Sequence, residues 1–282
     1  MEKINYGLEE MHRIQLDMLN MLIKVCENHG YSYSLAFGSL LGAVREHKII
    51  AWDDSIDVVM PYADYVRITA LPQEVWGQEL FMQTYYSDPQ YPRYYAKLRK
   101  NNTTLIKADY VSYDINQGIY INIMPLIKLS DHTEERKRQL KDAKLYKALT
   151  EGDPALSVME SLRLFPSFLL GSTRNKKEAL REELKDRVIK YEEQETKDCF
   201  VLAGENSLNL ALSRDWFSSS VDWEFEGMQV KIAAGWNEWL TLRYGDYMTV
   251  PISELQGDKI SGFVTLNTQR SYTEYKGKTY CV

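Results

Sequence analysis

The sequence predicts an α+β (mixed α/β) fold, in which one core of strands and helices carries a helical insertion. Short apolar runs typical of buried strands lie between amphipathic segments, but without a regular alternation of strand and helix. Residues 133–195 differ, because Lys, Arg, Glu and Leu dominate there and apolar positions recur at helical spacing. The chain has 282 residues, of which 44% are apolar, so it can bury a large core. We therefore expect a single domain over residues 1–282, with the insertion at about 130–212.

Helices and strands are expected to alternate irregularly in the first half of the chain. Residues 8–28 carry apolar side chains three and four positions apart, which predicts an amphipathic helix. Gly30 is a suitable end for this helix, because glycine adopts a left-handed backbone without strain. The other elements expected here are strands at 31–37, 56–60, 94–98 and 118–124 and helices at 40–45 and 62–76.

The second half of the chain begins with the helical block. Breaks are expected at 151–154, which contains Gly and Pro, and at 171–172, which is Gly-Ser. Residues 176–195 are so rich in charge that they predict a helix with a solvated face. Short strands and helices return over 213–251, and the polar tail at 252–282 predicts little.

Composition excludes several classes of protein. There are 34 basic and 40 acidic residues, so the formal net charge is −6 and a broad nucleic-acid interface is not expected. No apolar run reaches the roughly 20 residues that span a bilayer, and the N-terminus does not resemble a signal peptide. We expect a cytoplasmic protein without a transmembrane segment; association with a membrane through a partner stays open. The three cysteines are too far apart to suggest a disulfide framework or a metal site.

One segment combines a Gly-Ser turn with a dense group of acidic residues. Gly38 and Ser39 follow a predicted strand and open a predicted helix, whose first N–H groups suit a phosphate. Three carboxylates then lie within five residues, at Asp53, Asp54 and Asp57, just before a buried strand. Such density is costly unless a cation offsets it, and oxygen ligands suit Mg²⁺. Either motif alone would favour an ordinary solvated turn; together they favour a site for a metal and a phosphate.

This segment resembles the LicD family, whose members are relatives of the fukutin-type proteins in the nucleotidyltransferase superfamily. The resemblance starts with Gly-Ser-Leu-Leu-Gly-Ala-Val-Arg at 38–45 and continues with Trp-Asp-Asp at 52–54, Ile-Asp at 56–57 and Met-Pro at 60–61. Two further blocks agree: Tyr-Ala-Lys-Leu-Arg at 95–99 with Gly-Ile-Tyr-Ile at 118–121, and Tyr-Gly-Asp-Tyr-Met at 244–248. The matches span residues 8–127 and 213–251.

The resemblance implies a nucleotidyltransferase-like mixed sheet flanked by helices, with Mg²⁺ on acidic residues of adjacent strands. Family members transfer phosphocholine or another phosphorylated alcohol from a CDP-linked donor to a glycan hydroxyl. By resemblance, the partners are therefore a CDP-linked small molecule and a glycan or glycolipid acceptor. Gly38 and Ser39 would hold the donor phosphate, and Asp57 with Asp53 or Asp54 would bind the metal. The expected catalytic residues are Asp57, Asp54 and Asn122.

Two positions depart from the family pattern in ways that affect the chemistry. Ser55 and Asn122 stand where the family has carboxylates, and Asn cannot act as a general base. Loss of two charges should weaken Mg²⁺ binding. Either Asp53 or Asp54 takes over as a ligand, which leaves a working enzyme, or the chain is a non-catalytic protein that binds a nucleotide, a glycan or a partner. We favour the enzyme.

Four further residues are candidates for binding substrate: Arg45, Trp52, Lys97 and Arg99. The three cations could contact phosphates, and Lys97 and Arg99 alternate on a predicted strand, so that they share one face. Trp52 could stack on a base or a choline head group. The ordinary alternatives are solvated surface cations and a core aromatic.

Overall fold

The computed structural model describes residues 7–152, 173–203, 205–250 and 262–281. These form two compact units. The first comprises the described residues within Met1–Tyr91, Tyr95–Pro125 and Asp215–Val282, and the second comprises those within Pro92–Tyr94 and Leu126–Arg214. Helices and strands mix in both, so the expected α+β class is confirmed. The expected insertion at about 130–212 falls inside the second unit.

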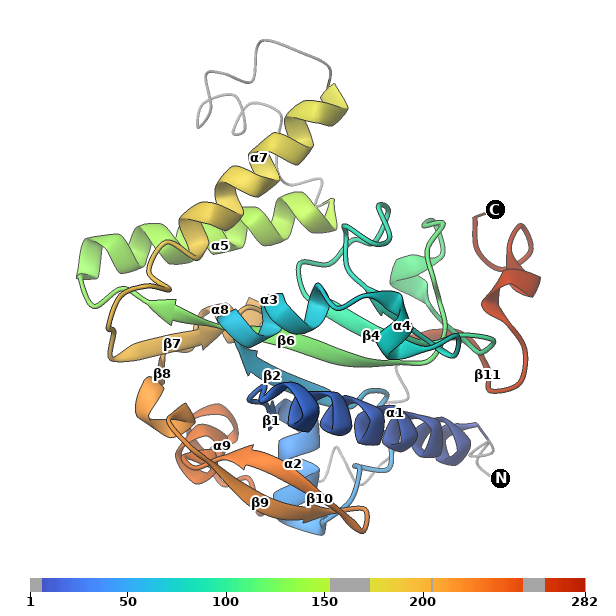
Figure 1. Cartoon of the computed structure of the whole chain (residues 1–282), viewed down its shortest axis with the longest axis horizontal. Helices are drawn as coiled ribbons and strands as arrows, with labels where there is room; N and C mark the ends of the chain where they lie inside the picture. The colour runs from blue at the N-terminus through green and yellow to red at the C-terminus, as the bar shows by residue number, and fades with distance from the viewer. Residues whose placement is uncertain (1–6, 153–172, 204, 251–261, 282) are drawn as a thin grey trace. The chain divides into compact units, whose positions relative to one another are not determined.

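A sheet forms the centre of the first unit (Figure 1). Its strand order is β1 (Ser34–Leu35), β2 (Asp57–Pro61), β6 (Tyr120–Leu129), β4 (Ala96–Lys100) and β3 (Leu80–Gln83). The pairs β1–β2, β3–β4 and β4–β6 are antiparallel. In the last of these pairs Lys97 is the direct partner of Asn122, so two of the candidate site residues share one register position.

Helix α1 (Leu8–His29) confirms the first predicted helix and its end at Gly30, where φ is 67°. Its buried side chains include Met11, Met18 and Leu22, which belong to the apolar stripe seen in the sequence. The strand expected at 31–37 is shorter than predicted, because Phe37 already opens α2 (Phe37–Glu46). The prediction of one helix at 62–76 is wrong, because the structure has two helices there.

That segment divides into α3 (Tyr62–Thr69) and α4 (Gln73–Trp76). Pro72 is the reason, because proline lacks an N–H and disfavours the helical conformation of the residue before it. The first unit also contains β5 (Thr104–Lys107), η1 (Ala108–Tyr110), β9 (Ser220–Phe225), β10 (Met228–Ala233), α9 (Trp236–Tyr244), β11 (Phe263–Asn267) and η4 (Tyr272–Tyr275). Strand β11 pairs with β5, so part of the unpredicted tail is ordered by a partner distant in sequence.

The second unit contains the helical block. It comprises α5 (Thr133–Glu151), α7 (Thr173–Val188), β7 (Asp198–Val201), α8 (Glu205–Leu208) and β8 (Leu212–Ser213), and η3 (Arg214–Phe217) follows at its boundary. Helix α5 ends where the first break was predicted, with Gly152 at φ 72°. The break predicted at 171–172 lies outside the described residues.

Helix α7 is not solvated along its whole surface. Leu180, Leu184 and Val188 recur every fourth residue and are buried, so one narrow face packs into the unit. The remaining face carries charged pairs such as Arg187–Glu183, whose side chains are 2.6 Å apart. The high charge of this segment predicted only its solvated face and gave no sign of the short apolar stripe.

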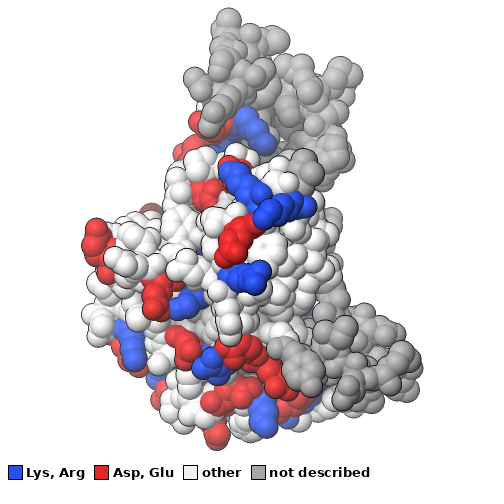
Figure 2. All heavy atoms as spheres, turned by 90° about the vertical axis from the view of Figure 1, so that its right-hand side faces the viewer, with Lys and Arg blue, Asp and Glu red and all other residues white. Residues whose placement is uncertain are grey.

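Charged side chains of both signs lie close together on the surface. On the face shown in Figure 2, Lys and Arg lie beside Asp and Glu instead of forming a separate basic area. Within the described residues, none of the helices is long and apolar enough to cross a bilayer.

Candidate active site

The Gly-Ser turn forms a corner where β1 ends and α2 begins. The preceding residue, Phe37, has a φ of 49°, which is rare for a residue with a side chain. A Cβ added at Gly38 would overlap Oδ2 of Asp53, so a carboxylate packs directly on the glycine backbone. No side-chain hydrogen bond caps the start of α2, and uncapped helix starts are common places for anions.

Ser39 and Asp57 lie in direct contact. The Asp57 backbone N–H donates to Ser39 Oγ at 2.8 Å, and Ser39 is buried. Ser55 Oγ donates to Asp57 Oδ1 at 3.2 Å, as expected for residues two apart on one side of an extended chain. The Gly-Ser corner and the acidic segment therefore converge on one place.

Asn122 links Asp57 to a buried cation. Its Nδ2 donates to Asp57 Oδ1 at 2.7 Å, and its Oδ1 accepts from Lys97 Nζ at 2.7 Å. Because an ammonium can only donate, Lys97 turns the amide oxygen toward itself and the amide NH₂ toward Asp57. Lys97 Nζ also lies 3.1 Å from the centroid of the Tyr120 ring. Asn122 thus orients Asp57, and Lys97 provides positive charge nearby.

Arg99 lies over the same Tyr120 ring, with Cζ 4.7 Å from the centroid. The two cations therefore share one face, as their alternation predicts. Arg99 is fully buried, and it donates to Gln83 Oε1 and to Gly118 O, each at 2.7 Å. These contacts give Arg99 a structural role in the sheet.

The loop that carries Asp53 and Asp54 is held from two directions. The side chain of Asp54 forms an ion pair with Lys107 of β5. From α1, His12 Nε2 contacts the Asp53 carbonyl at 2.7 Å and Gln15 Nε2 donates to the Asp54 carbonyl at 2.9 Å. Sequence analysis did not find these three supporting residues, because each is about 40 residues or more from the loop and belongs to no local motif.

The two remaining carboxylates are held in a setting that disfavours their charge. Burial, followed by the charges of Asp57 and Asp54, raises the pKa of Asp53 to about 7. Burial also raises the pKa of Asp57, although the Asn122 hydrogen bond and the charge of Lys97 oppose this. A cation bound between these groups would relieve both effects.

The described residues contain no group of three or more His, Cys, Asp or Glu side chains placed to hold a metal ion. Two carboxylates nevertheless suit Mg²⁺, which is often bound by one or two protein oxygens and completed by waters and substrate phosphates. Asp53 and Asp57 fit this role by their oxygen donors and by their disfavoured charge. Asp54 is less suited, because Lys107 already pairs with it.

The last two predicted site residues are Arg45 and Trp52, and neither belongs to the contact between Ser39 and Asp57. Arg45 lies in the last turn of α2, at the opposite end from Gly38, and forms an ion pair with Glu46 at 2.8 Å. Trp52 is half-buried in the turn that precedes Asp53.

Helix α9 reaches the corner from the C-terminal part of the chain. Arg243 Cζ lies 4.4 Å from the centroid of the Phe37 ring, and the Trp239 ring contacts Phe37 edge-on at 5.9 Å. The pKa of Tyr244 is raised, mainly by burial, and the charges of Asp57 and Asp53 contribute. Arg243 is a further residue that sequence analysis missed, although it directly precedes the Tyr-Gly-Asp-Tyr-Met block.

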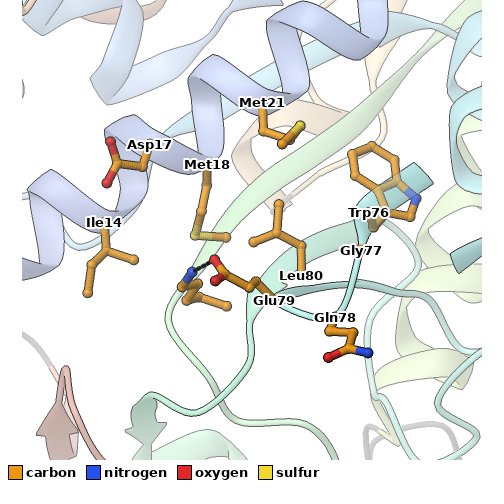
Figure 3. Close-up of a pocket in the computed structure, with 10 residues that line it drawn as sticks. Ile14, Asp17, Met18, Met21, Trp76, Gly77, Gln78, Glu79 and Leu80 are labelled. Carbon is orange, nitrogen blue, oxygen red and sulfur yellow. Dashed lines mark hydrogen bonds and ion pairs between the residues drawn. The ribbon is translucent and has the colours of Figure 1, made fainter. Parts of the chain in front are cut away.

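A separate pocket of about 350 Å³ lies between α1 and the α4–β3 segment (Figure 3). Met18, Met21 and Leu80 supply apolar lining, and two further lining residues, Lys100 and Glu79, form an ion pair at 2.5 Å. None of the candidate site residues lines it.

Comparison with known proteins agrees with the resemblance. Residues 30–146 match the LicD/FKTN/FKRP nucleotidyltransferase domain family. The chain is also similar to the lipopolysaccharide cholinephosphotransferase LicD of Haemophilus influenzae. The two are 28% identical over 268 residues, which cover 88% of this chain and 94% of the relative.

Proposed function

Because this chain carries a LicD-family domain over residues 30–146, we propose that it is a phosphotransferase. It would move phosphocholine, or a similar phospho-alcohol, from a CDP-linked donor to a hydroxyl of a glycan or glycolipid. The observation that carries the proposal is the convergence of the Gly38–Ser39 corner with the carboxylates of Asp53 and Asp57. The similarity to a lipopolysaccharide cholinephosphotransferase supports the choice of phosphocholine.

The corner would bind a phosphate of the donor. The first N–H groups of α2 lack a side-chain cap and carry the positive end of the helix dipole. Ser39 Oγ accepts from the Asp57 amide, so its own hydroxyl proton can be donated to a phosphate oxygen. The same hydrogen bond fixes the distance between the phosphate site and Asp57.

Asp53 and Asp57 would hold Mg²⁺. The bound ion would neutralise the diphosphate and stabilise the leaving nucleotide phosphate. Asn122 and Ser55 keep the Asp57 carboxylate in one orientation through their bonds to Oδ1, which leaves Oδ2 for a ligand. Lys97 limits the repulsion between the carboxylates before a substrate binds.

In the reaction, an acceptor hydroxyl attacks the phosphorus of the phosphocholine group, and the bond to the CMP oxygen breaks. Asn122 cannot accept the hydroxyl proton. This need not prevent turnover, because phosphoryl transfer through a loose transition state depends mainly on positioning and charge neutralisation. The proton then passes to water.

The direct test is a transfer assay with CDP-choline, Mg²⁺ and lipopolysaccharide. We expect CMP release that requires the acceptor and stops when a chelator removes the metal. Choline should appear on the acceptor in equal amount. Absence of choline transfer to lipopolysaccharide and to a panel of other glycans would contradict phosphocholine as the transferred group.

A second candidate function is non-catalytic binding of a nucleotide or glycan. One observation favours it: the groups bonded to Asp57 Oδ1 are the neutral Ser55 and Asn122, where the family pattern has carboxylates. The double substitution Ser55→Asp with Asn122→Asp should then create a stronger metal site, with Mg²⁺ affinity rising about tenfold or more.

Calorimetric titration of Mg²⁺ into the parent and the doubly substituted protein measures this gain. Transfer activity that appears only in the substituted protein would establish the non-catalytic alternative for the natural chain. Equal Mg²⁺ affinity in both proteins would mean that positions 55 and 122 do not face the metal.

A further inference from the structure

Helix α9 places a guanidinium beside the Gly-Ser corner. Arg243 stacks on the ring of Phe37, and Phe37 is followed directly by Gly38. The ring is also contacted by Trp239, which is buried and anchors α9. Stacking on an aromatic face restricts the orientation of a guanidinium while leaving its N–H edge available.

The backbone at this contact is strained. A φ of 49° is unfavourable for a residue with a side chain and persists only where the surroundings enforce it. The contacts of Trp239 and Arg243 with the Phe37 ring are part of such an environment. The strained residue therefore holds Arg243 and the start of α2 in one arrangement.

Arg243 is not neutralised by a carboxylate. Across the described ranges, none of the ion pairs involves Arg243, and its buried Nε has no hydrogen-bond partner. Phe37, on whose ring Arg243 stacks, directly precedes the Gly38–Ser39 corner. The Asp53 carboxylate packs on Gly38, and Ser39 accepts from the Asp57 amide. A guanidinium, an uncapped helix start and two carboxylates thus surround one region.

The cations expected from the sequence to bind phosphate are engaged elsewhere. Lys97 bonds to Asn122, Arg99 is buried against Gln83 and Gly118, and Arg45 lies at the far end of α2. None of these three described cations stacks beside the Gly38–Ser39 corner as Arg243 does.

We propose that Arg243 binds the diphosphate of the nucleotide-linked donor, opposite the carboxylates that would hold the metal. This inference rests on the proposed function for the identity of the donor, and it adds a substrate-binding residue to that site. The planar fork of the guanidinium matches two phosphate oxygens, and its stacking on Phe37 places it beside the first residue of α2.

The test compares Arg243→Gln with the parent by calorimetry, using CDP and cytidine in the presence of Mg²⁺. The affinity for CDP should fall about 10- to 100-fold, whereas the affinity for cytidine should stay within a factor of two. With CDP-choline as substrate, the substitution should act mainly by raising KM. Arg243→Lys keeps the charge but loses the fork, so its affinity for CDP should lie between those of the parent and Arg243→Gln.

Arg13→Gln is the matched control, because this exposed guanidinium on α1 pairs with a neighbouring side chain, Glu10, in the same helix. It should leave CDP affinity unchanged. Thermal unfolding of each variant checks the fold, and if Arg243→Gln does not fold, the comparison rests on Arg243→Lys. Unchanged CDP affinity in the variant tested would overturn the inference, and so would an equal loss for CDP and cytidine.

The inference and the proposed function can fail separately. CDP binding that depends on Arg243, in a protein that transfers no phosphocholine, would support the diphosphate site and refute the proposed reaction. Phosphocholine transfer that is unaffected by Arg243→Gln would refute the inference and leave the reaction standing.

Discussion

Asp57→Asn is expected to lower the rate of phosphocholine transfer by about 10³-fold while the protein stays folded. The amide has the shape of the carboxylate, so it can keep the contacts with Ser55 and Asn122. It lacks the negative charge that would hold Mg²⁺ against the diphosphate. Since burial disfavours the Asp57 charge, its removal should not lower the free energy of unfolding at pH 7.

The measurement is the initial rate of transfer from CDP-choline, together with thermal unfolding of the same preparation. Asp222→Asn is a suitable control, because Asp222 lies on β9 and forms an exposed ion pair with Lys231. Its activity should equal that of the parent. Activity of Asp57→Asn within threefold of the parent would remove Asp57 from the mechanism.

Asp53→Asn is expected to make the metal-free protein more stable at pH 8, by roughly 2–4 kcal/mol, although it removes a proposed metal ligand. Burial and the neighbouring carboxylates raise the pKa of Asp53 from an ordinary value of 3.8 to about 7. The folded protein therefore binds this proton more tightly than the unfolded chain does. Consequently the stability that protonated Asp53 contributes at low pH is lost as the pH rises from about 4 to about 7.

Urea unfolding at pH 4.5 and pH 8, with a chelator present, measures this difference. The gap between Asp53→Asn and the parent should be small at pH 4.5 and large at pH 8. Addition of Mg²⁺ at pH 8 should stabilise the parent and not the variant. A gap that is the same at both pH values would show that Asp53 is not held in a charge-disfavouring site.

Patterns confined to short stretches of the chain predicted the parts of the fold that depend on local physics. The apolar stripe of α1 and its end at Gly30 follow from helical periodicity and from the conformational range of glycine. The division of the segment after β2 at Pro72 is equally local, because it follows from the missing N–H of a single proline.

The same reasoning found the main parts of the candidate site but not their partners. The Gly38–Ser39 corner and the carboxylates of Asp53, Asp54 and Asp57 occupy one short stretch, so their spacing alone pointed to a metal and a phosphate. Their supporting groups come from α1, β5 and α9, which are distant in the chain and carry no motif.

Amino-acid order alone was thus sufficient for the end of α1, the Gly38–Ser39 corner and the concentration of negative charge. It was not sufficient for the state of each charge. Lys107 neutralises Asp54, Lys97 is committed to Asn122, and Arg243 arrives beside Phe37 from some 200 residues away. These outcomes depend on strand register and helix packing, because a charge acts on whatever lies within a few ångströms of it in space, irrespective of separation along the chain.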